Sequence, residues 1–117
     1  MTSTERKAGA GALYGTLEIL ILTTLKAHGA LHGLEIARVI HERSQDVLRV
    51  EEGALYPALH RLERQGLVEG EWQISEKRRR ARFYEITTAG KKTLRTELKN
   101  WIKHTEAVSK VLGLREA

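Results

Sequence analysis

Basic side chains crowd into one short stretch of this 117-residue chain. Positions 77–82 hold five of them, and the one acidic residue beside them is Glu76. The five are Lys77, Arg78, Arg79, Arg80 and Arg82. Such a group repels itself on a free surface, whereas ammonium and guanidinium groups bind phosphate oxygens strongly. The cluster therefore predicts contact with a polyanion; a solvated hairpin without a ligand is the alternative interpretation.

A second group with binding chemistry precedes this cluster, in the segment 53–65. One side of this predicted helix is the apolar stripe Leu55, Leu59 and Leu62. The opposite side carries Tyr56, Pro57, His60, Arg61 and Arg64. Arg61 and Arg64 suit phosphates or guanine edges, and Tyr56 suits a phosphate or a sugar. An ordinary solvated basic face is the other interpretation, and it applies most readily to His60.

A helix followed directly by a hairpin must position these two groups. Gly66 ends the predicted helix, and strands are predicted at Val68–Ile74 and Arg82–Thr87. Side chains alternate across a strand, so the cations of the hairpin cannot all face one ligand. The order helix, helix, helix, strand, strand, long helix is typical of a mainly α (α+β) winged helix-turn-helix domain.

The tip of the predicted hairpin, the wing, is the better placed part of the basic cluster. Lys77, Arg78 and Arg79 are expected to reach phosphate or the minor groove, and Arg80 is assigned to the same DNA-binding set. Arg80 and Arg82 can instead pair with acidic neighbours. The tip contains no glycine, which predicts a wider turn.

Two helices are predicted before the helix at 53–65, over Leu13–Lys26 and over residues 34–44. In the first of them, Ile19 and Leu22 point away from the main apolar stripe at 100° per residue, a geometry that makes the helix apolar on two sides. A helix on the surface of a small monomer would be apolar on one side only. We therefore expect Ile19 and Leu22 to contact a second copy of the chain.

The last helix, about 88–112, is predicted to be a dimerisation element, with Thr87 as its N-cap. A coiled-coil-like seam is indicated by residues at alternating spacings of four and three, flanked by Ile102 and Val111. These residues are Leu94, Leu98, Trp101, Thr105, Val108 and Leu112. The interface residues expected on it are Leu94, Leu98, Trp101, Ile102, Val108 and Leu112. The alternative is that this helix packs back on its own domain. The predicted division is a flexible arm at 1–12, a DNA-binding domain at 13–87 and a dimerisation helix at 88–117.

Composition narrows the classes of function. Lys and Arg total 20 against 15 acidic residues, giving a net charge of +5 that favours an anionic partner. There is no cysteine, so disulfides, thiolate zinc sites and a cysteine nucleophile are excluded. His28 and His32 have ligand-like spacing, but Gly29 lies between them and no third ligand is near, so no metal or other cofactor is expected. No catalytic motif is present, and we do not expect an enzyme. The longest apolar run, Ile19–Leu22, cannot cross a bilayer, and a cytoplasmic location is expected.

The chain resembles the PadR family of bacterial transcriptional regulators. The matching strings are LYGTLEILIL, HGLEIA, EEGALYPALHRLERQGLVEGEW, RRRARFYEITTAG and the tryptophan of ELKNWIKHTEAVSKVL. The resemblance covers roughly residues 13–112 and is closest to the compact subfamily with one terminal helix. It implies a homodimeric repressor that binds an inverted repeat in double-stranded DNA and is often released by a small ligand. Leu34 and Ala54 depart from the family's usual tyrosine and Ser or Thr, which removes two hydroxyls that can reach phosphates.

Two alternatives remain open from the sequence. The winged helix can instead be a module that binds a protein or RNA rather than a DNA operator. Trp101 can be a core packing residue, or two copies of it can stack on a flat aromatic effector at the dimer interface. In some compact members of the family the position of Trp101 helps to bind planar hydrophobic drugs.

Overall fold

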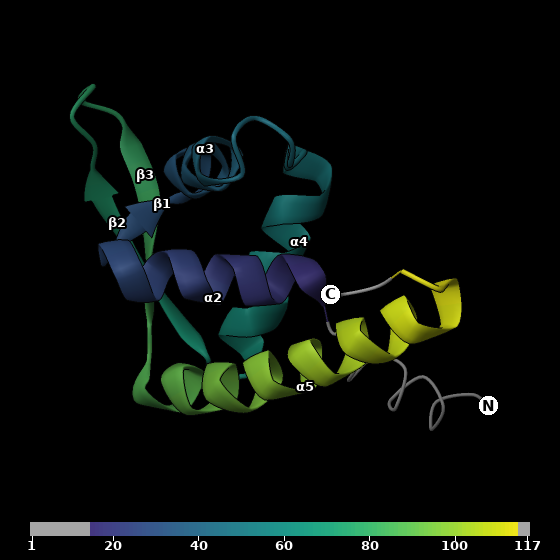
Figure 1. Ribbon diagram of the computed structural model, residues 1–117. Coiled ribbons are helices and arrows are strands. Elements are labelled where there is room, and N and C mark those ends of the chain that lie inside the picture. Colours follow the sequence, from purple (N-terminus) through teal and green to yellow (C-terminus); the bar gives the residue numbers. More distant parts are fainter. Residues whose placement is uncertain (1–14, 115–117) are drawn as a thin grey trace.

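The computed structural model describes residues 15–114, which fold into helices around a small sheet (Figure 1). In chain order the elements are α2 (Thr16–His28), β1 (Leu31–His32), α3 (Gly33–Arg43), α4 (Glu52–Arg64), β2 (Val68–Ile74), β3 (Arg80–Ile86) and α5 (Thr88–Leu112). The mainly helical winged helix-turn-helix fold that the sequence predicted is confirmed. The predicted arm, residues 1–12, lies outside the described residues, and the division at residue 87 remains a prediction.

The hydrophobic core lies between α2, α3 and α4, with the sheet and the first turns of α5 closing it. Ile21, Leu25, Ile36, Leu55 and Leu59 are among its most buried side chains. Figure 1 shows α2 crossing the molecule with α5 running beside it on one side, α3 on the other and α4 passing behind it. Burial on both sides requires α2 to be apolar around most of its surface, which explains its LEILIL run.

Ile19 and Leu22 are buried inside the single chain, contrary to the expectation that they face a partner. Their exposed fractions are 8% and 0%. The apolar residues of α2 that keep some exposure are Leu17 and Leu20, which pack on the edge of the core. The prediction was wrong because a helical wheel shows only that a helix is apolar on two sides. It does not show whether other parts of the same chain cover both sides.

Local chemistry sets the start of α3. Gly29 ends α2 with a φ of 82°, a left-handed conformation that suits glycine. His32 is the N-cap of α3: its Nδ1 accepts from the Glu35 backbone N–H at 3.4 Å, and a Glu35 carboxylate oxygen accepts from the His32 N–H at 3.2 Å. His32 therefore has a capping role in the chain.

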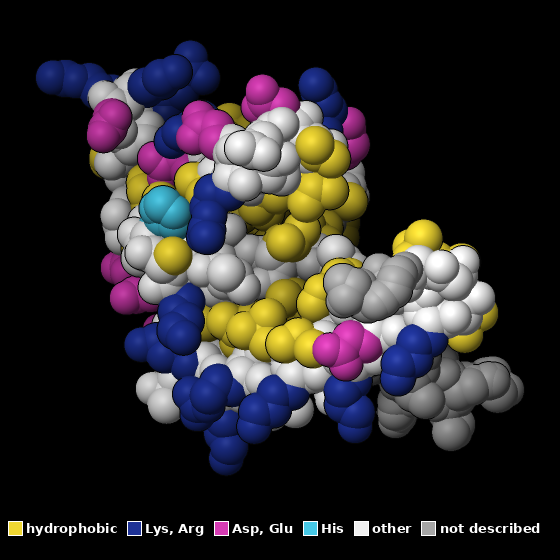
Figure 2. Space-filling model, in the orientation of Figure 1, with side chains coloured by type: hydrophobic (Ala, Val, Ile, Leu, Met, Phe, Trp, Pro, Cys, Tyr) yellow, Lys and Arg dark blue, Asp and Glu magenta, His cyan; other side chains and the backbone are white. Residues whose placement is uncertain are grey.

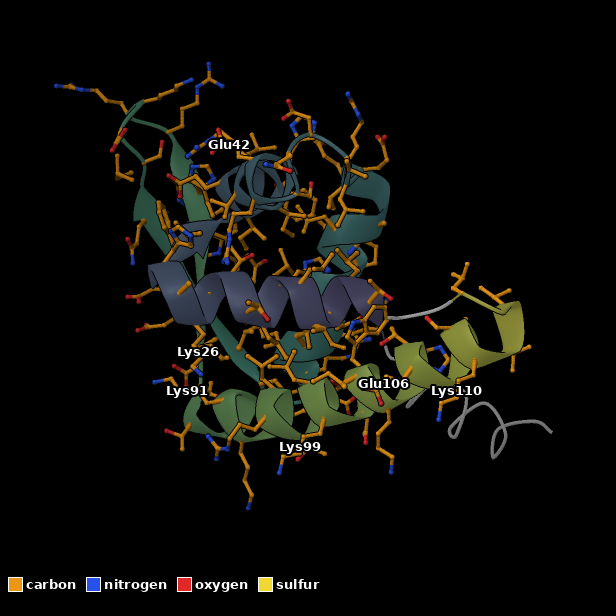
Figure 3. The ribbon with its side chains drawn as sticks, viewed as in Figure 1. Lys26, Glu42, Lys91, Lys99, Glu106 and Lys110 are labelled. Carbon is orange, nitrogen blue, oxygen red and sulfur yellow. The ribbon has the colours of Figure 1, made fainter. Side chains whose placement is uncertain are left out.

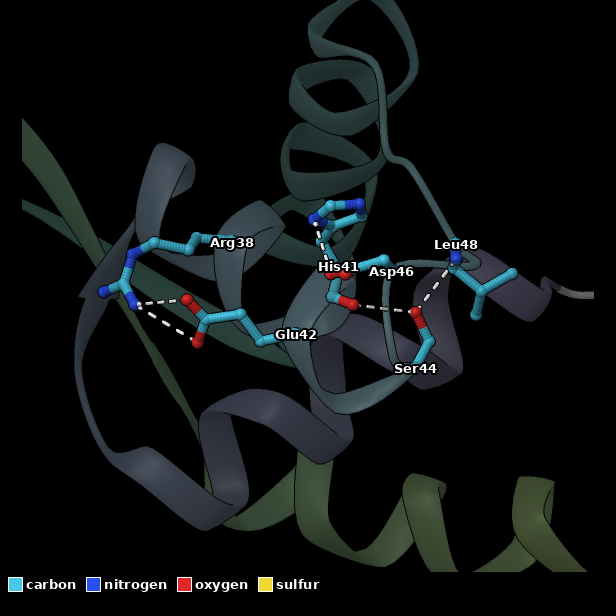
Figure 4. Close-up of polar contacts among 6 residues, drawn as sticks. All are labelled: Arg38, His41, Glu42, Ser44, Asp46 and Leu48. Carbon is cyan, nitrogen blue, oxygen red and sulfur yellow. Dashed lines mark hydrogen bonds and ion pairs between the residues drawn. The ribbon is translucent and has the colours of Figure 1, made fainter.

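The connection from α3 to α4 is closed by polar contacts around Ser44 (Figure 4). The Ser44 hydroxyl donates to the His41 carbonyl at 3.0 Å and accepts from the Leu48 N–H at 2.9 Å. Asp46 has a φ of 67°, and its N–H donates to the same His41 carbonyl at 2.8 Å. These bonds satisfy backbone groups at the end of α3 and fix the direction in which the chain leaves for α4.

The sheet has the order β1-β3-β2, and both of its pairings are antiparallel. The hairpin β2–β3 runs from the pair Val68–Ile86 to the pair Ile74–Arg80. The range predicted for β2 is confirmed, whereas β3 begins at Arg80 rather than Arg82. The short strand β1 was not predicted, because two residues are too few to show a period.

The wing tip is a five-residue turn, residues 75–79, and is wider than the two-residue hairpin turns that favour glycine, as predicted. The Ser75 N–H donates to the Arg79 carbonyl at 2.8 Å, and the Arg78 N–H donates to the Ser75 carbonyl at 2.8 Å. Arg78 takes the left-handed conformation that a glycine would normally occupy, with a φ of 60°. The chain therefore stores strain at its most basic turn, at a cost of about 1–2 kcal/mol.

The last helix, α5, spans the predicted range and begins at the predicted cap. The Thr87 hydroxyl accepts from the Gly90 N–H at 2.9 Å. Gly90 lies against the Leu67 carbonyl, and any side chain there would collide with that oxygen. α5 packs on α2 at first and then extends beyond the core (Figure 1).

Candidate nucleic-acid interface

A groove of about 1100 Å³ separates the wing from α3 and α4. Leu34 and Arg38 line it from α3, and Tyr56 and His60 line it from α4. The wing side is lined by Trp72, Lys77, Arg79, Arg80 and Arg82, among others. The groove therefore brings the two predicted groups together, one from the helix and one from the hairpin.

Tyr56 is the half-buried anchor of the helical side. Its ring packs against Gly33, where a Cβ atom would lie 2.6 Å from the tyrosine hydroxyl oxygen. This contact requires glycine at the first position of α3. Burial, and to a smaller extent the Glu52 carboxylate, raises the pKa of the Tyr56 hydroxyl above its ordinary value. The hydroxyl therefore stays protonated at neutral pH and can donate a hydrogen bond to a phosphate oxygen.

His60, Pro57 and Arg64 lie on the exposed side of α4. His60 lines the groove beside Tyr56, whereas Arg64, near the end of the helix, is not among the groove residues. Pro57 falls in the second turn, because α4 begins at Glu52, slightly earlier than predicted. It has no N–H to donate to the Gly53 carbonyl, so that acceptor stays on the exposed helix surface.

Arg61 forms an ion pair within the chain that the sequence did not predict, and its side chain remains 47% exposed. Its Nη2 and Nε atoms donate to the same Glu18 carboxylate oxygen of α2, at 2.6 and 3.1 Å. Glu18 is buried, so the pair compensates a carboxylate that would otherwise lie unpaired in the core. Arg61 is thus turned toward α2 and holds α4 to it. The partners are 43 residues apart, a separation that gives no local signal.

Arg82 is also held within the chain, as one of the two alternatives predicted. It forms an ion pair with Glu63 of α4, and its Nη2 donates to the Gly70 carbonyl at 3.3 Å. Gly70 is suited to this position, because a Cβ atom there would lie 2.5 Å from the Arg82 Nε atom. Arg82 therefore ties the hairpin to α4 and sets the width of the groove.

Arg80 stacks on a tryptophan that the sequence analysis did not assign. The Arg80 guanidinium carbon lies 4.6 Å from the centre of the Trp72 ring, within the range of a cation–π contact. Trp72 is exposed on the groove side of the wing. Its strand position was the available signal: even-numbered residues of β2 share the face of buried Val68, so Trp72 continues this face beyond the core.

The remaining cations of the cluster are the tip residues Lys77, Arg78 and Arg79. All three are exposed, and none has a carboxylate within ion-pair distance in the described part of the chain. Figure 2 shows the basic side chains of the tip projecting beyond the body of the molecule, near α3. Of the cluster, these three are the side chains most available to an external anion.

The predicted seam of α5 is divided by the edge of the core. Leu94 has an exposed fraction of 2%, so it belongs to the core of its own chain and cannot contact a partner as predicted. Trp101 is half-buried against the core, with its ring centre 6.2 Å from that of His104. Further along, the seam is open: Ile102 is 54% exposed and Leu112 is 64% exposed. Leu98 and Val108 are also among the exposed hydrophobic residues.

Two absences hold for residues 15–114. No group of three His, Cys, Asp or Glu side chains there is arranged to hold a metal ion. None of the helices in this range combines the length and the apolar character needed to cross a membrane.

Comparison with known sequences gives two relevant matches. The model of the transcriptional regulator PadR-like family matches residues 21–96. The transcriptional regulator Rv3488 of Mycobacterium tuberculosis is 40% identical over 67 residues, which cover 57% of this chain and 62% of that protein. The chain therefore spans somewhat less than two thirds of the length of this relative.

Solved structures match over a larger share of the chain. A PadR family transcription regulator from Clostridium difficile R20291 is 27% identical with a TM-score of 0.68, and the match covers 84% of this chain and 99% of that one. A PadR family transcriptional regulator from Eggerthella lenta DSM 2243 is 25% identical with a TM-score of 0.72, covering 96% and 93%.

Proposed function

The chain belongs to the PadR-like family of transcriptional regulators, and from this premise we propose that it is a homodimeric repressor that binds an inverted repeat in double-stranded DNA. The observation that carries the proposal is the shared groove, in which the exposed side of α4 and the basic wing border one space. A duplex bound there contacts the helix through the major groove and the wing through an adjacent phosphate strand or the minor groove.

The roles in this proposal follow from how each side chain is held. Tyr56 and His60 present donors from α4, and Arg64 extends this surface toward the end of the helix. Lys77 and Arg79 supply mobile charge at the tip, and phosphate contacts of this kind fix orientation rather than sequence. Arg61 has no direct DNA contact in the proposal, because it is bonded to Glu18.

Dimerisation is proposed through the open part of the α5 seam. Leu98, Ile102, Val108 and Leu112 are exposed in one chain. Leu98, Val108 and Leu112 belong to the seam with alternating spacings of four and three, and Ile102 flanks it. Pairing of two copies along this line would remove those side chains from water and present two copies of α4 across a two-fold axis. Such a dimer reads half-sites about one helical turn apart. Because its proposed target is chromosomal DNA, the dimer would be located in the cytoplasm.

A salt titration tests DNA binding and its specificity. The purified protein is titrated onto a duplex from its own promoter region and onto a random duplex of equal length. Six to ten phosphate contacts would make affinity fall about 10³- to 10⁵-fold between 50 and 200 mM salt. Equal affinity for both duplexes would reject specific regulation. Tighter binding to an RNA of the same length would support the RNA-binding alternative.

The proposal includes an aromatic effector site beside Trp101. Its indole is only half-buried and lies next to the open seam, so two copies can flank a flat ligand. Planar aromatic compounds should then quench its fluorescence, and Trp101→Phe should abolish this response. A Trp72→Phe variant keeps Trp101 as the reporter. Loss of quenching in this variant would place the ligand in the wing instead.

A further inference from the structure

A second basic surface, the lysine row, runs along α5. It consists of Lys91, Lys92, Arg95, Lys99, Lys103 and Lys110, all of which are exposed. Figure 2 shows Lys and Arg side chains along the outer edge of α5, separated from those of the wing tip by the body of the molecule. In Figure 3, Lys91, Lys99 and Lys110 mark the course of the row along the helix. The groove between α4 and the wing does not include these residues.

The spacing of the row is regular and unfavourable to the isolated helix. Lys91, Arg95, Lys99 and Lys103 follow one another in steps of four, which places successive cations about 6 Å apart along about 18 Å of helix. Like charges at this spacing destabilise a helix. Cations near the start of a helix also oppose its macrodipole, and the first turn of α5 contains no acidic residue.

The row has no ion-pair partner among residues 15–114. None of its cations has a carboxylate within ion-pair distance, although Arg61 and Arg82 elsewhere in the chain each have one. Glu106 lies on the same helix and forms no ion pair with the row (Figure 3). Lys92, Lys99 and Lys103 lie about 140–180° around α5 from Leu94, so pairing along the apolar seam leaves them in solvent.

We propose that the lysine row binds the phosphate backbone of a second DNA segment, so that one protein molecule bridges two duplexes. A row of about 18 Å is as long as about five base-pair steps along the axis of a duplex. Protein interfaces are depleted of lysine and anchored by aromatic side chains, whereas the row has no aromatic residue among its cations. A regular polyanion therefore suits it better than an acidic protein. The bridging of two duplexes rests on the proposed DNA binding by the wing. The affinity of the row for duplex DNA is independent of that proposal.

Two variants of equal charge separate the row from the wing. The row variant carries Lys92→Gln, Arg95→Gln, Lys99→Gln and Lys103→Gln. The wing variant carries Lys77→Gln, Arg78→Gln, Arg79→Gln and Arg80→Gln. Each loses four positive charges, so a difference between them reports position rather than net charge. Circular dichroism and thermal unfolding check that both variants and their combination are folded.

The first experiment measures binding of a short random-sequence duplex at low salt. The wing variant should bind it at least about ten-fold more tightly than the combined variant, because only the former retains the row. Equal binding by these two proteins would overturn the proposal, and it would do so whether or not the wing reads an operator.

The second experiment measures bridging. The protein is bound to an immobilised promoter duplex, and capture of a labelled random duplex is recorded. The row variant should hold the first duplex and lose most capture of the second. Capture equal to that of the unmodified protein would overturn the proposal. Displacement of the second duplex by polyglutamate at equal or lower charge concentration would also overturn it, because the row would then bind acidic proteins at least as well.

Discussion

The groove side of the molecule and the outer side of α5 are both basic, but they are built differently. Around the groove the cations are mostly arginines, and several are fixed: Arg61 by Glu18, Arg82 by Glu63 and Arg80 by the Trp72 ring. Along α5 they are mostly lysines without an ion-pair partner in the described range. Fixed guanidinium groups shape a surface, whereas free ammonium groups follow the charge of their ligand. If both surfaces bind DNA as proposed, the fixed arginines of the first suit it to reading sequence, and the free lysines of the second suit it only to attracting phosphates.

The largest expected effect is a difference between the two surfaces in their contribution to the affinity for promoter DNA. Replacing Lys77, Arg78 and Arg79 with glutamine should weaken binding to the promoter duplex by about 100-fold at low salt, because three phosphate contacts are lost. Replacing Lys92, Lys99 and Lys103 in the same way should change that affinity less than about three-fold. Fluorescence anisotropy across a salt series measures both. Equal losses would mean that net charge, not position, decides operator binding.

The next effect tests the difference between fixed and free arginines within α4. Arg61→Gln should lower the free energy of unfolding by about 1–3 kcal/mol, because the buried Glu18 carboxylate loses its partner. Arg64→Gln should leave stability within about 0.5 kcal/mol and instead reduce the preference for operator over random DNA. Urea denaturation and competition binding give the two readouts. A stable Arg61 variant with lost preference would show that Arg61 contacts DNA directly.

A smaller effect concerns the strained turn at the tip. Arg78→Gly should raise the free energy of unfolding by up to about 1 kcal/mol, since glycine adopts a positive φ without steric cost. The matched change Arg79→Gly removes the same charge at a position without positive φ, so it should not stabilise the protein. Both changes should weaken DNA binding similarly. Thermal unfolding that moves in the same direction for both variants would contradict the assigned strain.

The smallest effect concerns a carboxylate of α5 outside the row. Desolvation raises the pKa of Glu97, and one of its oxygens is buried without a hydrogen-bond partner. A raised pKa in the folded state means that ionisation disfavours folding. Because solvent screens this partly exposed group, Glu97→Gln should raise stability at pH 7 by no more than about 0.5 kcal/mol. This gain should shrink as pH falls through the raised folded pKa and be lost below the unfolded pKa of about 4.3, where both states are protonated. Urea denaturation at pH 7 and pH 4 tests it, and a constant gain would exclude titration as its cause.

Features carried by short patterns along the chain could be predicted from the sequence. The extent of α5, its Thr87 cap and the range of β2 depend on neighbouring residues, and all three were predicted correctly. The basic tip was also found, because its charges are consecutive. Which cations remain free could not be read from this pattern, since Arg82 and Glu63 meet only when the hairpin packs on α4.

Features that depend on packing between distant elements were missed or wrongly assigned. Leu94 and Leu22 fit an outward seam on a helical wheel, but α2 and α5 cover each other within one chain. Arg61 fits the DNA-facing side of α4, but Glu18 on α2 binds it. Trp72 has no partner nearby in sequence, and its contact with Arg80 arises from the strand pairing. In each case the decisive neighbour is supplied by the fold.

The close contact between Gly90 and the Leu67 carbonyl also has a consequence for the proposed operator. Because nothing larger than hydrogen fits there, the start of α5 is held against the end of the hairpin at a set angle. In a dimer joined through α5, that angle would affect the distance between the two copies of α4. In the proposed dimer, the glycine at position 90 would therefore help to match the protein to the spacing of its half-sites.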